Sequence, residues 1–357
     1  MRFALEVPMP KSPARRNRLS RRIGIVAAFL ALAILPFHPS PASASRSAEM
    51  HALSLLPPSA DLVVWVDYFA LRKSDLVAEM EKRIDSIPEA AEHYREFVRE
   101  TGLDPRQDTD QVLLSLRSVT DSGGSGFLLI AQGRFAGNRI LETAAEKGGA
   151  LTSPREGVKI WIFRGTARPE DPSPVKAIVA LAEIDGTTLL FGEESEVLRA
   201  ADVADGAKRP ETKEPRFRDL LAGADRKAPV WAVLNSRSLA AQISSEIARN
   251  NSEWKPGEAV ASVDSIQLAC WVGKDLDMKI QVGAKDAESA GLLGDLFRGA
   301  VAAGKLAAKD RDPELLSTLQ ELTIEEDGKG IEVRVRIPGS RIRSSENFGP
   351  AGEARAD

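Results

Sequence analysis

The sequence is poor in the residues from which catalytic and metal sites are most often built. It has one cysteine and three histidines in 357 residues. A single cysteine excludes an intrachain disulfide, so packing must stabilise the fold. The three histidines are His38 in the apolar N-terminal region, His51 shortly after it and His93 on a helical pattern, which leaves little for a Ser-His-Asp triad or a multi-histidine metal centre. We therefore expect no catalytic residues, no metal and no cofactor.

Long apolar runs are also scarce, and the exception lies near the N-terminus. A basic stretch precedes the apolar residues 23–35, "IGIVAAFLALAIL", and the small-residue stretch "PSPASAS" follows them. This order is typical of a secretory signal peptide, and Ala42-Ser43-Ala44 predicts cleavage after Ala44. As a helix the run would be about 20 Å long, short of the roughly 30 Å of a bilayer core. We expect an extracytoplasmic protein, either periplasmic or secreted; the alternative is an inner-membrane anchor formed by residues 23–37.

Positive charge is in short supply as well. The chain has 48 Lys and Arg against 52 Asp and Glu. Residues 1–44 carry seven of the Lys and Arg residues and one Glu, so their removal leaves a net charge of about −10. Proteins that bind nucleic acid usually carry a basic stripe. We therefore expect no nucleic-acid partner, and membrane contact only through an uncleaved signal.

The remaining sequence alternates between strand and helix patterns. Short hairpin turns require antiparallel pairing, and helical patterns interrupt the strands at similar places in both halves. The predicted fold class is α+β, with two related units that are each a mainly antiparallel sheet with helices on one face. The predicted divisions are a signal peptide (1–44), a leader (45–56), a first unit (57–204), a linker (205–228), a second unit (229–339) and a disordered tail (340–357).

Matching landmarks in the two halves predict an internal duplication. Four residues of the first half pair in order with four of the second, with separations that decrease steadily. These pairs are Asp67 with Asn235, Asp110 with Asp264, Gly133 with Gly283, and Asp185 with Asp327. Because Asn235 can accept a backbone N–H bond but cannot act as a carboxylate base, we interpret Asp67 as a helix N-cap.

The two units differ in their strand patterns. Strands of the second unit alternate apolar and polar residues, which predicts one solvated face. The first-unit segments "FLLIA", "KIWIF" and "TLLF" are apolar at nearly every position, so both faces need cover. The cover could come from the second unit, the linker, a partner or an apolar ligand. If it is a ligand, the candidate binding residues are Trp161, Phe163, Leu129 and Leu190.

Other reactive side chains have simpler structural interpretations. Cys270 alternates with apolar strand residues, which favours a core position. His93 lies on a helical pattern and is expected to be solvated. Asp104, Asp108 and Asp110 lack the glycine and terminal glutamate of an EF-hand loop, so turn and capping roles are favoured over Ca²⁺ binding.

Two segments resemble a family of secreted bacterial proteins of unknown function. The openings "LPPSADLVVWVD" and "TGLDPRQDTDQVLLSL" are similar to its LP-x-x-A-D start and its TGLDP turn, and the resemblance covers roughly residues 55–200. It implies an exported α+β domain without an established activity, and it supplies no catalytic residues.

Three hypotheses about function follow. The favoured one is a non-enzymatic exported protein that binds a partner at the cell envelope. The first alternative is a carrier of a lipid or another apolar molecule, with a pocket in the first unit. The second alternative is a hydrolase that uses carboxylates alone, among them Asp67, Asp104, Asp108 and Asp110.

Overall fold

The protein is built on one continuous antiparallel sheet. The computed structural model describes residues 42–117, 126–146, 150–155, 158–164, 178–236, 262–309 and 311–344. Its sheet has twelve strands in the order β11-β12-β10-β9-β8-β1-β2-β3-β7-β6-β5-β4. The strands are β1 Leu62–Asp67, β2 Thr109–Arg117, β3 Gly126–Gly133, β4 Ala150–Arg155, β5 Val158–Arg164, β6 Ile178–Ile184, β7 Thr188–Glu193, β8 Val230–Asn235, β9 Val263–Val272, β10 Leu276–Ala284, β11 Thr323–Asp327 and β12 Gly330–Ile337.

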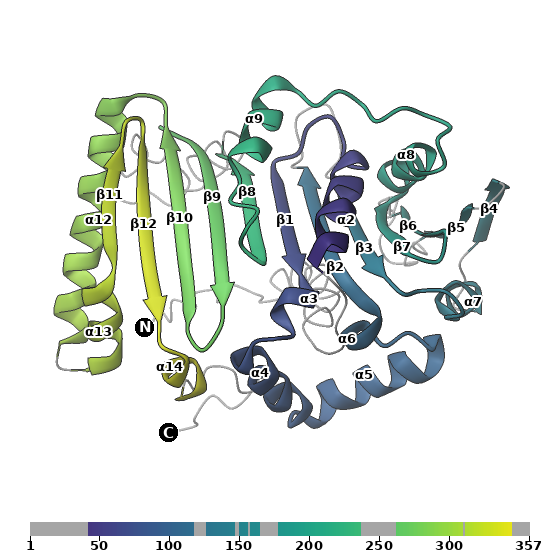
Figure 1. Ribbon diagram of the computed structural model, residues 1–357, viewed down its shortest axis with the longest axis horizontal. Helices are drawn as coiled ribbons and strands as arrows, with labels where there is room; N and C mark the ends of the chain where they lie inside the picture. The colour runs from purple at the N-terminus through teal and green to yellow at the C-terminus, as the bar shows by residue number, and fades with distance from the viewer. Residues whose placement is uncertain are drawn as a thin grey trace, which may run out of the picture.

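Helices fill most of the connections between these strands (Figure 1). They are α2 Ala42–Ser54, α3 Tyr68–Leu71, α4 Asp75–Asp85, α5 Pro88–Thr101, α6 Pro105–Asp108, α7 Ile140–Glu146, α8 Glu194–Ala204, α9 Pro215–Gly223, α12 Ala287–Ala308, α13 Pro313–Glu321 and α14 Gly339–Ser344. The predicted α+β class and the antiparallel pairing are confirmed.

The two halves of the sheet meet at strands β1 and β8. From that joint outward, the strand order β1-β2-β3-β7-β6 on one side matches β8-β9-β10-β12-β11 on the other, and the first half adds the β5-β4 hairpin. In the antiparallel ladder between β1 and β8, Val64 pairs with Ala232 and Trp65 with Trp231. The predicted linker 205–228 therefore does not separate two sheets.

One lateral row of side chains crosses the sheet from β5 to β11 on one face, which we call the cavity face. Successive ladder pairs place an apolar residue in this row on each of these eleven strands. The row reads Trp161, Leu181, Phe191, Leu129, Leu114, Val64, Ala232, Leu268, Ile280, Val333 and Ile324. Such a row requires cover along its full length.

In the first half, helices lie against both faces. On the cavity face, residues of α3, α5 and α7 form one cluster with β2 and β3. On the opposite face, α2, α8 and α9 bury Trp65 and Trp231, whose rings stack with centroids 6.4 Å apart. Helices on one face alone were expected, but both faces of these strands are apolar, so both are covered.

The second half has one apolar and one polar face, as its alternating pattern predicts. On the cavity face, α12 packs its Leu293 over Val282 and Ile331. The opposite face carries ion pairs such as Arg336–Asp277, at 2.7 Å between Nε and Oδ1, and Lys279–Asp225, at 2.7 Å. The end of α9 reaches this face at Gln267, next to Gly223, and polar side chains occupy the face.

Local sequence signals fix several element ends. Ser74 caps α4 by accepting a hydrogen bond from the Val77 amide at 3.3 Å. Gly102 ends α5 in the left-handed conformation, with φ of 66°. The β6–β7 hairpin turns through Asp185 and Gly186, which both have positive φ. All three were predicted from residue type, because caps and tight turns admit few alternatives.

The segment assigned to a leader forms part of helix α2 and belongs to the core. Ala52, Leu55 and Leu56 are fully buried beneath the sheet. The Arg199 guanidinium donates to the carbonyl oxygens of Leu55 at 2.7 Å and Leu56 at 3.2 Å, where the helix has ended. Of the predicted signal peptide, residues 1–44, residues 1–41 lie outside the described residues, and residues 42–44, which include the predicted cleavage site, form the start of α2.

Three further expectations differ from the structure. The residues 317–326, "STLQELTIEE", have a strand pattern, but residues 317–321 are the end of α13, because Asp312 caps a helix that has Pro313 in its first turn. Residues 339–344, assigned in part to a disordered tail, form α14. Strand β4 was not predicted, because its sequence contains Pro154, which argues against a strand. Proline is tolerated in edge strands, and β4 is an edge strand of the sheet. The helix expected over 238–249 lies outside the described residues.

Candidate ligand cavity

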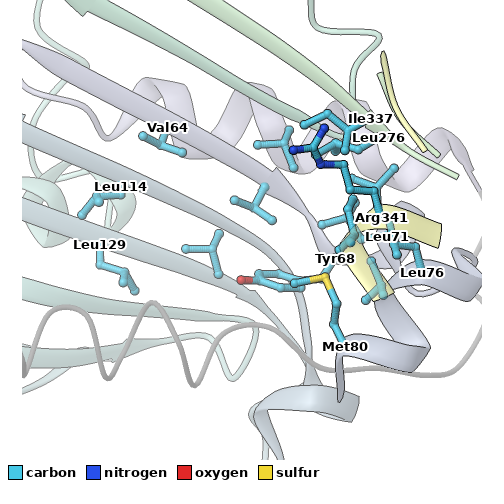
Figure 2. Close-up of a pocket in the computed structure, with 16 residues that line it drawn as sticks. Val64, Tyr68, Leu71, Leu76, Met80, Leu114, Leu129, Leu276, Ile337 and Arg341 are labelled. Atoms are coloured by element: carbon cyan, nitrogen blue, oxygen red, sulfur yellow. The ribbon is translucent and has the colours of Figure 1, made fainter. Parts of the chain in front are cut away.

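A cavity of about 570 Å³ opens on the cavity face where the two halves of the sheet meet (Figure 2). Strands β1, β2, β3 and β8 form its floor, α3 and α4 form one wall, and the ends of β9, β10 and β12 with α14 form the other. The described lining consists of Val64, Val66, Tyr68, Leu71, Leu76, Val77, Met80, Val112, Leu114, Leu129, Val230, Val272, Leu276, Ile337, Arg341 and Ile342.

The turn after β1 positions the first wall. The Asp67 carboxylate accepts a hydrogen bond from the Ala70 amide at 2.9 Å and so begins α3, which brings Tyr68 and Leu71 to the cavity. The capping role predicted for Asp67 is thereby confirmed. Arg72, which is 3% exposed, then pairs with Asp110 at 2.9 Å and donates to the Thr109 carbonyl, so α3 is tied to the start of β2.

The two walls are joined by hydrogen bonds. The Ser74 hydroxyl, besides capping α4, donates to the Gly273 carbonyl oxygen at 2.9 Å in the β9–β10 turn. Across from it, the Gly339 amide donates to Asp275 at 3.0 Å, and Arg83 of α4 donates to the Ile342 carbonyl oxygen at 3.3 Å. Figure 1 shows α4 and α14 side by side at this end of the sheet. These bonds fix the width of the cavity.

Two lining residues carry strongly polar groups. The Arg341 side chain donates to Thr318 Oγ1 at 2.6 Å and to the Glu314 carbonyl oxygen, and it lies 3.6 Å from Asp312. It therefore anchors α14 to α13. The Tyr68 side chain is 5% exposed, and burial raises its pKa well above the ordinary value. Apart from these two, the described lining is made of aliphatic and methionine side chains. Such a lining is suited to holding an apolar molecule rather than to acid–base chemistry.

The four ligand residues predicted from sequence are not brought together. Leu129 lines the cavity. Trp161 and Phe163 lie on the same face but on the outer strand β5, where they pack against the cluster under α7. Leu190 is fully buried on the opposite face, under α8. The prediction placed all four residues on one surface. Successive side chains along a strand point to opposite faces of the sheet, so an apolar run does not form a single surface.

The aspartates of the hydrolase hypothesis serve structural roles. Asp104 caps α6 through the Arg106 amide at 2.9 Å and accepts a hydrogen bond from the Tyr94 hydroxyl. Asp108 accepts from the Asp104 amide at 2.8 Å. Asp110 pairs with Arg72. With Asp67 at the start of α3, these carboxylates are distributed over caps and ion pairs, and they do not meet in the cavity.

The lone cysteine and the helical histidine occupy the positions expected of them. Cys270 is buried on β9, where burial is the larger cause that raises the pKa of its thiol to about 11. A thiol with that pKa is a poor nucleophile at neutral pH. His93 is exposed on α5. Within the described ranges, no group of three or more His, Cys, Asp or Glu side chains could hold a metal ion.

The comparisons with known proteins give no family. No family model matches the sequence, and no curated protein matches it. Among solved structures, one titled "Structure of crystal form I of TP0453" aligns over 82% of this chain and 94% of its own, with a TM-score of 0.42 and 11% sequence identity. A likeness at this level carries no argument about function. In the part of the chain that the structure describes, no helix is long and apolar enough to cross a membrane.

Sequence reasoning missed most of the lining. The residues from α3, α4 and α14 reach the cavity only because β1 and β8 pair, and that pairing leaves no periodic signal in the sequence. The sequence contained one signal for this part of the lining. Leu76, Val77 and Met80 share the apolar face of α4, and an apolar helix face requires a packing partner.

Proposed function

We propose that the protein is an extracytoplasmic, non-enzymatic binding protein whose ligand is an apolar small molecule held in this cavity. The observation that carries the proposal is the cavity itself, with its almost entirely apolar lining and a volume of about 570 Å³. Ligand pockets in proteins typically measure about 300 to 1,000 Å³. The apolar residues 23–35 support export.

The energetics favour a chain-like ligand. Burial of each methylene contributes about 0.8 kcal/mol, so about eight methylenes in the cavity would contribute about 6 kcal/mol. Because the cavity lies between the two halves, the ligand would contact both. This differs from the sequence hypothesis, which placed the pocket in the first unit alone.

The same arrangement supports an internal duplication, which we include in the proposal. If Asp67 is equivalent to Asn235, then Val64 is equivalent to Ala232, and these two residues pair directly across the joint between the halves. A two-fold relation between two copies requires such a pair of equivalent residues. The matching strand orders on either side of the joint add to this support.

Binding of a fluorescent apolar compound tests the proposal. N-phenylnaphthylamine, which is uncharged, should bind the full chain with a stoichiometry of about one. Val66→Phe places a ring in the cavity and should reduce affinity at least about tenfold, since the space is then occupied. Leu306→Gln is the matched control: Leu306 is 76% exposed on α12 and outside the cavity, so affinity should be unchanged. Loss of binding in Leu306→Gln but not in Val66→Phe would contradict the proposal.

Binding of a partner protein stays a prediction. Its best starting point among the described residues is the outer side of α12, where Leu292 is 60% and Leu306 is 76% exposed. Nothing in the described structure indicates what would cover these leucines.

A further inference from the structure

The Tyr68 hydroxyl is a polar group that faces an apolar cavity. Burial is the single cause that raises the pKa of this tyrosine, and no charged or hydrogen-bonding neighbour contributes. Among the described residues, none forms a hydrogen bond with this hydroxyl. In Figure 2 its oxygen points toward the side of the cavity formed by Leu114 and Leu129. The group is thus protonated at neutral pH and directed into the space a ligand would occupy.

The second tyrosine of the chain shows what a satisfied hydroxyl looks like here. The sequence contains two tyrosines. The Tyr94 hydroxyl donates to Asp104 Oδ1, and the Arg106 guanidinium lies over the Tyr94 ring with 3.9 Å to its centroid. A hydroxyl that faces an apolar cavity and has no partner among the described residues can hydrogen-bond to a polar atom of a ligand. A phenylalanine at position 68 would fill the same space without leaving a donor unpaired.

We propose that Tyr68 is the recognition residue of the cavity, and that the ligand is an uncharged lipid-like molecule with one hydroxyl, ester or ketone oxygen that hydrogen-bonds to Tyr68. This inference rests on the proposed function and names the ligand class. The apolar chain of the ligand would lie along the floor, over Val64, Leu114 and Leu129. The ligand oxygen would accept a hydrogen bond from the Tyr68 hydroxyl or donate one to it.

A neutral head group fits better than a carboxylate. A carboxylate beside Tyr68 would lose its hydration among aliphatic side chains, and an ionised group is costly to bury without a paired cation. The cation that lines the cavity, Arg341, is engaged by Thr318, the Glu314 carbonyl oxygen and Asp312 on α13. It holds α14 in place, so the site offers a neutral donor and acceptor at Tyr68.

Competition between matched probes tests this inference. Hexadecanol, hexadecane and palmitate are each tested as competitors of N-phenylnaphthylamine. The assay uses the full-length wild-type chain, Tyr68→Phe and Tyr94→Phe. Hexadecanol should bind the wild-type chain about five- to tenfold more tightly than hexadecane, because one hydrogen bond is added. Tyr68→Phe should lose this preference while its affinity for hexadecane is unchanged. Tyr94→Phe, which removes a hydroxyl outside the cavity, should keep it.

Thermal unfolding of the ligand-free variants gives a second readout. Tyr68→Phe should melt at the same temperature as wild type or higher, since it removes no hydrogen bond to a described residue. Tyr94→Phe should melt lower, since it removes the hydrogen bond from the Tyr94 hydroxyl to Asp104. A lower melting temperature for Tyr68→Phe would mean that the hydroxyl is satisfied within the protein, and would overturn the inference.

The remaining outcomes separate this inference from the proposed function. Equal binding of hexadecanol and hexadecane by the wild-type chain would overturn the role of Tyr68 and leave the apolar cavity standing. Preference for palmitate that is lost in Arg341→Gln would also overturn it, in favour of an acidic ligand. Failure of every probe, including N-phenylnaphthylamine, to bind the folded wild-type chain would overturn both proposals.

Discussion

At the scale of single residues, burial and hydrogen bonding decide which polar side chains are available for chemistry. Asp67 caps α3 and Cys270 packs in the sheet, so neither is available for chemistry. These roles could be predicted because capping and strand alternation depend on neighbours in sequence. The environments of Tyr68 and Glu81 could not, because both depend on residues from distant elements.

Glu81 of α4 should make stability depend on pH. Its side chain is 4% exposed next to the cavity wall, and burial raises its pKa to about 8, while Arg106 and Arg72 lower it by a smaller amount. Its folded-state pKa exceeds the unfolded value of 4.5, so the folded protein holds the extra proton between these two pH values. The free energy of unfolding should therefore fall as pH rises through this window.

Glu81→Gln stays neutral at every pH and should remove most of that fall. Urea unfolding near pH 5 and near pH 8 measures it, with Glu89→Gln, an exposed change on α5, as the control. If wild type and Glu81→Gln lose the same stability between the two pH values, the buried acid is not responsible.

At the scale of elements, the ends of the chain behave differently from the sequence-based expectation. Helix α2 was assigned to a leader and α14 in part to a disordered tail, because both lack a strong apolar periodicity. In the structure, Ala52, Leu55 and Leu56 are buried in the core and Arg199 binds the carbonyl oxygens after α2, while Arg341 and Arg83 hold α14. Some of these contacts join residues more than a hundred positions apart, and others depend on one charged side chain. Neither kind produces a periodic pattern in the sequence.

Removal of α14 should open the cavity. A chain that ends at Pro338 loses Arg341 and Ile342 from the lining, together with the bond from Arg83. We expect the affinity for N-phenylnaphthylamine to fall by several-fold, because part of the apolar contact is replaced by water. A chain that ends at Ser344 keeps α14 and should bind as the full chain does. Equal affinities of the two shortened chains would show that α14 is not part of the binding site.

At the scale of the whole molecule, the sheet was largely predictable and the cavity was not. Continuous apolar runs in the first half and apolar alternation in the second located nearly all the strands, and Asp-Gly turns fixed two hairpins. The direct pairing of β1 with β8, which makes one sheet of two units, has no counterpart in local sequence. The cavity depends on that joint, because its floor uses strands from both sides and its walls use α4 and α14.

The central claim is that one apolar molecule occupies the cavity at this joint. Native mass spectrometry of the full chain mixed with hexadecanol tests it most directly, since it counts bound molecules per chain. The account predicts one hexadecanol per wild-type chain and none, or nearly none, per Val66→Phe chain under the same conditions. Equal loading of the two proteins, or a broad distribution of several molecules per chain, would contradict it.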